Sequence, residues 1–430
     1  MKYSRFSLLI LMLISFLYAT AQSVLNPVFK GATKANRDKT YQYIIKQSIT
    51  ENLSVPLTDS TEENWEEAFY GMELIHYKQL WVNEKVKTAF NSVDKRSGSF
   101  QRALMELLYT NYTTDFKNEV NGLFLNSPYP KVFAMCAEYL LRTDRSPAYA
   151  SKMKEIILTR IAENFEQDSI ALLITGELLQ QFSKPCKKNI PQNLAPLLKK
   201  NWLPGNPIVY SIQRKNRSYP GIVIVRDSNG VFIKNDTGNI FFVQQLARSI
   251  TNMPSYLTNG NTPQGIFRML GFAVSKSPAL GPTQNIQLTM PLETTIQQFL
   301  KDSSITDSVW TPELYEQLLP ASLKKYHPLF QSYYASAIGR TEIIAHGTTV
   351  NPAYYKGETY YPYTPTQGCL CTKEIWSEAD GKRLISDQQK LVDAVKKAGG
   401  PDGYLIVIEI DDQQKPVGIN EILPYLKSTK

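Results

Sequence analysis

The sequence predicts an α+β protein, in which an N-terminal all-α helical domain is followed by a mostly β domain with a helical insertion. Apolar residues recur at helical spacing through residues 60–181. From residue 208 onward, short apolar segments of strand length dominate instead. The stretch between them holds Lys, Pro, Asn and Gly, which is typical of a boundary. We therefore divide the chain into a helical domain over 22–183, a linker over 184–206 and a second domain over 207–430.

The first 21 residues predict a signal peptide for export. Lys2 and Arg5 give a basic start, and an apolar run of 12 residues follows from Phe6 to Leu17. Ala19-Thr20-Ala21 is an A-x-A cleavage site. The run is short for a bilayer span, and no other segment is long and apolar enough to cross a membrane. We expect an exported protein of the periplasm or cell envelope, with no transmembrane segment after signal cleavage.

The helical domain is predicted from one strong apolar face and a series of turns. A short helix is expected at 41–47, and Ser60 with Glu63 suggests a capping box before the next helix. The buried face of that helix is formed by Trp65, Phe69, Met72 and His76. Further helices are expected over 81–92, 99–110, 113–125, 130–142, 148–164 and 168–181. Short helices in series indicate a bundle or a repeat-like array, and no strict period chooses between them.

The second domain is predicted mainly from its strand-like segments. These are 208–213, 221–226, 231–234, 240–244, 265–272, 284–290 and 342–345. The segment 293–336 reverts to helix, with a helix start at Thr311-Pro312, and we expect this insertion to lie beside the site. A helix is expected at 383–397. Residues 404–410 are strongly apolar, as in a central buried strand.

The residues that carry chemistry are a His and a Cys, each beside a glycine. His346-Gly347 lies 23 positions before Cys369, which Gly368 precedes, in a chain with only three His and four Cys. A thiol becomes strongly nucleophilic when a neighbouring imidazole takes its proton. Glycines beside both residues allow the backbone to approach a substrate closely. The mechanism requires the sulfur and the imidazole to come within roughly 3–4 Å of each other.

These residues resemble the catalytic motif of the L,D-transpeptidase (YkuD-type) family, which cross-links bacterial peptidoglycan. That motif is His-Gly, a variable loop, then Ser/Thr-His-Gly-Cys, an apolar residue, and Arg or Asn. Thr366, Gly368, Cys369 and Leu370 fit their places. Gln367 stands where a second His is usual, and Cys371 stands where Arg or Asn is usual, so the match to the motif is incomplete.

A second segment in the right order supports the resemblance. Thr262-Pro263-Gln264-Gly265-Ile266-Phe267 is similar to the T-P-x-G-x-F segment that precedes the family's catalytic motif. A hairpin formed by 221–225 and 231–233 also fits the start of that domain. The resemblance covers roughly residues 205 to 425.

The resemblance implies acyl transfer from a peptidoglycan stem tetrapeptide through a Cys369 thioester. His346 would be the base, oriented by the backbone carbonyl of Gly347. Residues Thr366, Gln367, Gly368 and Tyr363 would contact the substrate or its oxyanion. Neither cofactor nor metal is required. The acceptor could be a stem amine, water (as in an L,D-carboxypeptidase) or a protein lysine.

Two rival readings stay open. The first is a non-catalytic peptidoglycan-binding or envelope scaffold protein, whose helical domain recruits an envelope partner. The altered positions Gln367 and Cys371 favour it, whereas retention of His346 and Cys369 counts against it. The reactivity of the thiol distinguishes this scaffold from the transpeptidase. An activated Cys369 should react with thiol probes well below pH 8.5, whereas an inert one should not. The second is an exported cysteine peptidase of another fold, which leaves Thr262-Pro263 unexplained.

The remaining cysteines and charges restrict the partners. Cys136 and Cys186 could form a disulfide in an exported protein. A metal site at Cys369-x-Cys371 is disfavoured, because the chain has few other soft ligands. The formal charge of +8 falls to +6 after Lys2 and Arg5 leave. Much of the excess positive charge lies at 184–217. This segment could be a solvated basic linker or a surface for an anionic envelope polymer. Nucleic acid is not expected as a partner.

Seven tyrosines cluster near the proposed site. Their rings could line a groove for sugar or peptide, or could pack the long loop against the sheet. They are Tyr333, Tyr334, Tyr354, Tyr355, Tyr360, Tyr361 and Tyr363. His76 is expected to be a core residue, and His327 to lie in the insertion.

Overall fold

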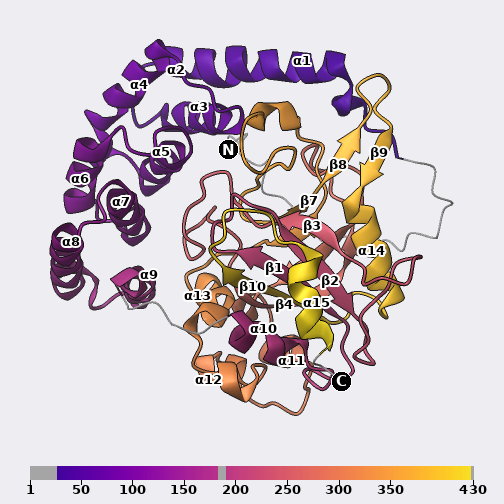
Figure 1. Ribbon diagram of the computed structural model, residues 1–430. Coiled ribbons are helices and arrows are strands. Elements are labelled where there is room, and N and C mark those ends of the chain that lie inside the picture. The colour runs from indigo at the N-terminus through magenta and orange to yellow at the C-terminus, as the bar shows by residue number, and fades with distance from the viewer. Residues whose placement is uncertain (1–26, 183–189, 428–430) are drawn as a thin grey trace.

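The protein is a helical region followed by a strand region that closes into a barrel, as a computed structural model shows (Figure 1). The structure describes residues 27–182 and 190–427. The predicted signal peptide lies outside these residues, as does Cys186. The expected order of a helical part, a strand part and short helices inserted among the strands is therefore confirmed. No helix of the described residues is long and apolar enough to span a membrane.

The helical region runs as an arc from α1 to α9 around one side of the barrel (Figure 1). Its α-helices are α1 (Lys34–Tyr43), α2 (Asn52–Ser54), α3 (Glu62–Leu74), α4 (Leu80–Phe90), α5 (Gly98–Asn111), α6 (Lys117–Asn126), α7 (Pro130–Thr143), α8 (Pro147–Arg160) and α9 (Ser169–Leu179). The helix expected at 41–47 is longer, because α1 continues through a π-helix at Ile44–Glu51 into α2. The capping box expected at Ser60 is absent: the N-cap of α3 is Thr61, whose hydroxyl bonds to Pro56 O instead.

The strand region is a closed barrel in the order β1-β10-β4-β5-β6-β7-β3-β2. Its strands are β1 (Ile208–Arg214), β2 (Gly221–Arg226), β3 (Val243–Leu246), β4 (Gly265–Ala273), β5 (Asn285–Thr289), β6 (Ile344–His346), β7 (Leu370–Thr372) and β10 (Tyr404–Asp411). Strand β10 is central as expected, since it pairs in parallel with β1 and antiparallel with β4. A separate hairpin joins β8 (Glu374–Trp376) to β9 (Arg383–Ser386).

Two predicted elements of this region are wrong in detail. Residues 231–234 form only isolated bridges, Arg226 with Phe232 and Lys234 with Ile240, so the expected hairpin has one full strand. The helix expected from residue 383 begins at Asp387 as α14 (Asp387–Lys397), because Arg383–Ser386 pairs as β9 and Ser386 caps the helix. At Arg383–Ser386, pairing with β8 overrides the local helical pattern.

The barrel has an apolar interior and one apolar outer face. Alternate residues of all eight strands share one buried cluster, which includes Val209, Phe267, Ala345 and Leu370 and is joined by α14. The other face of β1, β2, β4 and β10 packs beneath helices, with residues such as Ile208 and Ile406. The alternation follows from the two-residue period of a strand. The same alternation determines which side chains of β6 and β7 point out of the barrel.

The segment 184–206, expected as a linker, contains a helix that belongs to the barrel. Helix α10 (Ile190–Leu198) carries Leu194, Leu197 and Leu198, which are buried in the outer cluster with β1 and β10. Trp202 follows and donates its indole N–H to Leu318 O at 2.8 Å. Burial of these apolar side chains, rather than the Lys and Pro content, decides where this stretch lies.

The inserted residues between β5 and β6 form short helices against the outer face. They are the 3-10 helix Pro291–Glu293, α11 (Ile296–Leu300), α12 (Pro312–Glu316), the 3-10 helices Ala321–Leu323 and His327–Phe330, and α13 (Gln331–Ala337). The predicted start of α12 at Pro312 is confirmed. The Tyr315 hydroxyl donates to Leu329 O at 2.7 Å and accepts from Ile266 N at 2.8 Å, so it ties the insertion to β4.

The helical arc contacts the strand region at its start, in its middle and at its end. At its start, Arg37 pairs with Glu378 at 3.2 Å, beside the β8–β9 hairpin. At its end, His327 Nε2 lies 3.0 Å from Glu177 Oε1 of α9. Between these, α5 and α7 hold the loop 252–261: Tyr256 donates to Glu138 Oε1 at 2.9 Å, and Asn259 donates to Glu106 Oε2 at 3.0 Å. The helices therefore fix a loop that also reaches the site described below.

The buried Glu138 makes this contact sensitive to pH. Burial raises the pKa of Glu138 from 4.5 to about 7, so the folded protein binds this proton more tightly than the unfolded chain does. Stability should therefore fall as pH rises from about 4.5 to about 7, with the cost fully present above that range. We expect Glu138→Gln, which stays neutral and can still accept from Tyr256, to shrink the stability difference between about pH 5 and about pH 8 by up to about 3 kcal/mol.

Urea unfolding at the two pH values measures this difference. Glu155→Gln, on an exposed position of α8, is the matched control and should leave the pH dependence unchanged. Equal pH dependence in the wild type and in Glu138→Gln would show that Glu138 does not titrate in this range.

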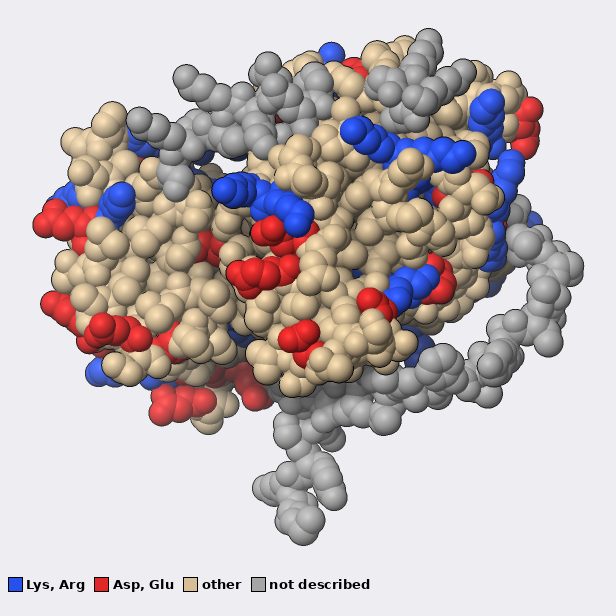
Figure 2. Space-filling model, turned by 90° about the horizontal axis from the view of Figure 1, so that it is seen from below, with Lys and Arg blue, Asp and Glu red and all other residues tan. Residues whose placement is uncertain are grey.

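Lys184, Lys187 and Lys188 of the basic excess expected at 184–217 lie outside the described residues, and the described remainder is not a single surface patch. Arg214 is fully buried and pairs with Asp411 at 2.7 Å and Glu421 at 2.8 Å. Arg217 is buried too and pairs with Glu409 at 3.0 Å. In the face seen in Figure 2, basic and acidic residues are interspersed among uncharged ones. The described structure therefore gives no support to a docking surface for an anionic polymer there.

Candidate functional site

The site lies where β6 and β7 run side by side in parallel. Their register pairs Ala345 with Leu370 and His346 with Cys371. Ala345 and Leu370 belong to the barrel interior, so the two-residue period turns His346 and Cys371 to the outside. Cys369 directly precedes β7 and lies two residues before Cys371, on this same outer side. Two segments that are 23 residues apart in the chain are thus neighbours in the sheet.

The imidazole of His346 is buried and fixed by the backbone next to it. Its Nδ1 lies 2.5 Å from Gly347 O, so Nδ1 carries the proton and donates it to this carbonyl. Burial lowers the pKa of His346 from 6.5 to about 4, and the bond to Gly347 opposes this shift. At neutral pH the ring is therefore neutral, and Nε2 holds the lone pair that could accept a proton.

A buried carboxylate, which sequence reasoning missed, supports the backbone at Gly347. Glu374 of β8 accepts from Thr348 N at 3.1 Å, and also from Thr283 Oγ1 at 2.6 Å. A Cβ at position 347 would come 2.3 Å from the Glu374 carboxyl group, so only glycine fits there. Glu374 therefore holds the peptide whose carbonyl orients His346. Nothing in the local sequence distinguishes this glutamate from an exposed one.

The thiol of Cys369 is partly exposed, and its hydrogen bond goes to a carbonyl rather than to the imidazole. Among the described residues, Sγ contacts Glu342 O at 3.6 Å, and no hydrogen bond joins it to His346. Glu342 has a φ of 64°, which is uncommon for a residue with a side chain. Burial raises the pKa of Cys369, so the resting group is a thiol at neutral pH. This is opposite to the low-pKa thiol that the sequence suggested for an activated nucleophile.

The side chain of Thr366 stabilises the turn that precedes Cys369. Thr366 Oγ1 donates to Cys369 O at 2.8 Å and accepts from Gly368 N at 2.9 Å. The Gly368 N–H is therefore not free to bind an oxyanion in this structure. Thr262, of the T-P-x-G-x-F segment, donates to Gly368 O at 2.9 Å. The two sequence motifs thus meet at one peptide.

A second residue that sequence reasoning missed, Arg340, lies against this turn. Its guanidinium donates to Asn261 O at 2.7 Å, to Gly260 O at 2.5 Å and to Ser255 O. A Cβ at position 368 would come 1.9 Å from Arg340 Nη2, and the Gly368 φ is 111°. Position 368 therefore requires glycine for two reasons: its backbone has a positive φ, and a side chain there would collide with Arg340. Nothing in the sequence around Arg340 distinguishes it from an exposed arginine.

The other predicted contacts fall in different surroundings. Gln367 is exposed, next to the thiol. Tyr363 is buried, and its hydroxyl donates to Gln244 Oε1 at 2.9 Å. Tyr355, Tyr360 and Tyr363 form a buried cluster with Leu246 and Ile250. These rings mainly pack the long loop, and Tyr361 is the one that stands well exposed.

The remaining histidines and cysteines lie away from the thiol. The expectation that His76 is a core residue on a helix face is wrong: it lies beyond the end of α3 with a φ of 50° and is only partly buried, edge-on to the ring of Tyr355 at 5.3 Å. His327 stacks on Tyr334 in the insertion. Cys136 is a free buried thiol in the helical core, and Cys371 is free and buried beside Thr364 Oγ1 at 3.8 Å. Within the described residues, no group of His, Cys, Asp or Glu is arranged to hold a metal ion.

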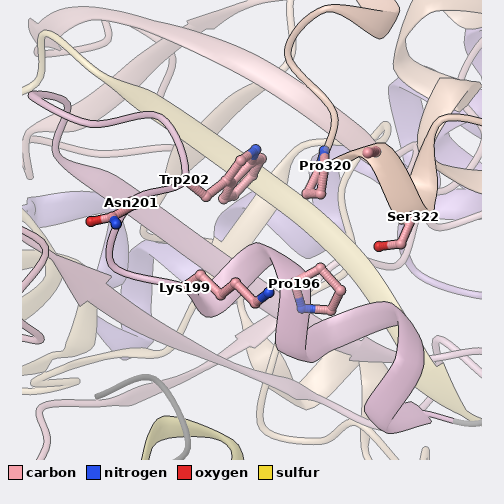
Figure 3. A pocket seen from close by; sticks show the side chains of 7 residues that line it. Pro196, Lys199, Asn201, Trp202, Pro320 and Ser322 are labelled. Carbon is pink, nitrogen blue, oxygen red and sulfur yellow. The ribbon is translucent and has the colours of Figure 1, made fainter.

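A surface hollow of about 410 Å³ lies elsewhere, between the end of α10 and the insertion (Figure 3). It is lined by Pro196, Lys199, Asn201, Trp202, Pro320, Ala321 and Ser322. None of the predicted site residues takes part in it. We therefore assign the candidate site to the β6–β7 region on its chemistry.

No protein-family model matches the chain, and neither a curated protein nor a solved structure matches it. Function is therefore inferred from the geometry and chemistry of the site.

Proposed function

We propose that the protein is an exported peptidoglycan-modifying enzyme, an L,D-transpeptidase-like acyltransferase that uses Cys369 as its nucleophile. The observation that supports this proposal is the parallel pairing of β6 with β7, whose register sets the anchored His346 opposite Cys371, two residues after Cys369. The hydrogen bond from the Thr262 hydroxyl to Gly368 O adds support, because it joins the two family-like motifs.

The proposed reaction needs one movement of the thiol. Cys369 leaves Glu342 O and turns toward Nε2 of His346, which is neutral and can accept the proton. Catalytic hydrogen bonds are often loose without substrate and tighten when it binds. The resulting thiolate attacks the carbonyl of the L-centred third residue of a stem peptide.

The acyl group is then transferred in two stages, as in other thiol acyl transfers. The C–N bond to the terminal D-alanine breaks, and the imidazolium gives its proton to the leaving amine. A thioester to Cys369 remains. A stem amine attacks it to give a 3→3 cross-link, or water attacks it to give a trimmed tripeptide. A protein lysine in the same role would link protein to the wall.

The second candidate function is a non-catalytic peptidoglycan-binding scaffold. The thiol's bond to Glu342 O and its raised pKa favour this reading, as do Gln367 and Cys371 at the altered motif positions. On this reading the surface beside Cys369 binds stem peptides without reaction, and the helical arc recruits an envelope protein.

Mass spectrometry of the exported form with a disaccharide tetrapeptide separates the two. We expect loss of D-alanine, products as a 3→3 dimer or a tripeptide, and a transient adduct on the peptide that contains Cys369. Binding of the muropeptide without any of these products would support the scaffold instead. Absence of both binding and turnover would remove peptidoglycan as the substrate class.

A further inference from the structure

Arg340 is a buried cation whose partners are neutral. Its side chain is 4% exposed, and it donates to three backbone carbonyls of the loop 255–261. Within the described residues, no carboxylate lies within ion-pair distance of it. A buried charge without a counter-charge is costly, so such a residue is expected to face a group that can become negative.

The group that Arg340 faces is the turn of the candidate nucleophile. The guanidinium packs on the Cα of Gly368, where an added Cβ would lie 1.9 Å from Nη2. The next residue is Cys369. The attraction is mutual: among neighbouring charges, the Cys369 thiolate acts most strongly to raise the pKa of Arg340, and Arg340 acts to lower that of Cys369.

We propose that Arg340 is a positioning residue whose positive charge faces the Cys369 sulfur and stabilises its thiolate, and that His346 does not supply this charge at rest. This role rests on the proposed function in one respect: the proposed function supplies the reaction in which the thiolate acts as a nucleophile. When the proton moves from sulfur to Nε2 of His346, the S–H bond breaks and an N–H bond forms. The anion left on sulfur then has a cation beside it that never loses its proton at neutral pH.

His346 is a poor candidate for the same task at rest. Its ring is buried and neutral, with its proton on Nδ1 directed to Gly347 O. The other titratable or charged groups near the pair differ in sign. Glu342 disfavours the thiolate, Glu293 favours the cation, Arg217 opposes it from the β1–β2 side, and Cys371 lies beyond Cys369 on the same strand. Arg340 is therefore the positive charge best placed to act on the sulfur.

The test measures the thiol pKa directly, without substrate. Iodoacetamide alkylation of the full-length mature protein is followed over about pH 6 to about pH 10, peptide by peptide, by mass spectrometry. We expect Arg340→Gln to raise the apparent pKa of Cys369 by at least about one unit, so that alkylation below that pKa slows about tenfold. Arg340→Lys keeps the charge and should retain most of the wild-type rate. Glu342→Gln, at an exposed position, should shift the pKa the opposite way.

The controls separate charge from folding. Arg226→Gln removes another buried arginine that donates to two backbone carbonyls, those of Lys199 and Trp202, and should leave the Cys369 profile unchanged. Cys136 and Cys371 are buried, so their protection from alkylation reports that each variant is folded. Should Arg340→Gln not fold, Arg340→Met carries the test, because it also removes the charge; it must raise the apparent pKa of Cys369, and an unchanged profile would overturn the inference.

Three results would overturn the inference. They are an unchanged Cys369 profile in folded Arg340→Gln, an equal shift in Arg340→Gln and Arg340→Lys, and a shift in His346→Asn as large as that in Arg340→Gln. None of these depends on muropeptide turnover. A protein that fails to process muropeptides but shows the expected pKa shifts would refute the proposed function and leave the electrostatic role of Arg340 intact.

Discussion

Replacing Cys369 by alanine is expected to abolish the thioester and to lower turnover of a disaccharide tetrapeptide by at least about 10³-fold. No other described nucleophile at this turn can take its place, since Thr366 Oγ1 is already engaged by Cys369 O and Gly368 N. Turnover is measured by chromatography of the released D-alanine and the peptide products. The fold should be retained, because the thiol is partly exposed and its hydrogen bonds are only to backbone groups of the described residues, at Glu342 and Ile344.

Cys371→Ala is the matched control for this experiment. Cys371 is a thiol two residues after Cys369, within β7, but it is fully buried and lies against Thr364. Its removal should cost about 1 kcal/mol of stability and change turnover less than about tenfold. Equal loss of turnover in both variants would indicate that the strand, and not the Cys369 sulfur, is needed. Equal retention would exclude Cys369 as the nucleophile.

Adding a methyl group at Gly368 is expected to have the largest effect on the structure of the site. Gly368→Ala places a Cβ 1.9 Å from Arg340 Nη2 and 2.6 Å from Gly260 O, at a backbone φ of 111°. The buried guanidinium must move away from its three carbonyls. We expect the free energy of unfolding to fall by about 3–5 kcal/mol and turnover to be lost with it. Urea unfolding and the Cys369 alkylation profile measure the two effects.

Gly357→Ala separates the backbone effect from the clash. Gly357 lies in the loop between His346 and Cys369 with a φ of 101°, and an added Cβ there meets nothing within 4 Å. Its cost should be only the backbone strain, about 1–2 kcal/mol, with turnover retained. If Gly357→Ala is as harmful as Gly368→Ala, the packing of Arg340 on position 368 is not what the site depends on.

Much of the fold could be predicted because its signals are local. The helices α4, α5, α7 and α9 follow from apolar spacing and their turn residues, and Pro312 marks its helix start. Strand β10 follows from an apolar run too short for a helix. Where the sequence misled, a distant partner decided the outcome. Residues 383–386 pair with β8, and the leucines of α10 are buried by the barrel.

For the site, the sequence predicted the His and the Cys beside their glycines, but not the groups that pack against those glycines. His-Gly and Gly-Cys are informative because glycine next to a reactive side chain implies a close approach of other groups. The structure gives those approaching groups: Glu374 at Gly347 and Arg340 at Gly368. Neither could be identified from the chain, because an isolated Glu or Arg looks the same whether it is solvated or buried.

The amino-acid order by itself determined the two-part architecture, the strand that ends at His346 and the turn that presents Cys369. Periodicity and glycine act within a few residues, so these features need no knowledge of the rest of the molecule. Only the tertiary structure decided that β6 lies beside β7, that the imidazole is neutral and that Arg340 packs against Gly368, the residue before Cys369. Those properties depend on barrel closure and on burial, which bring together charges that are far apart in the chain.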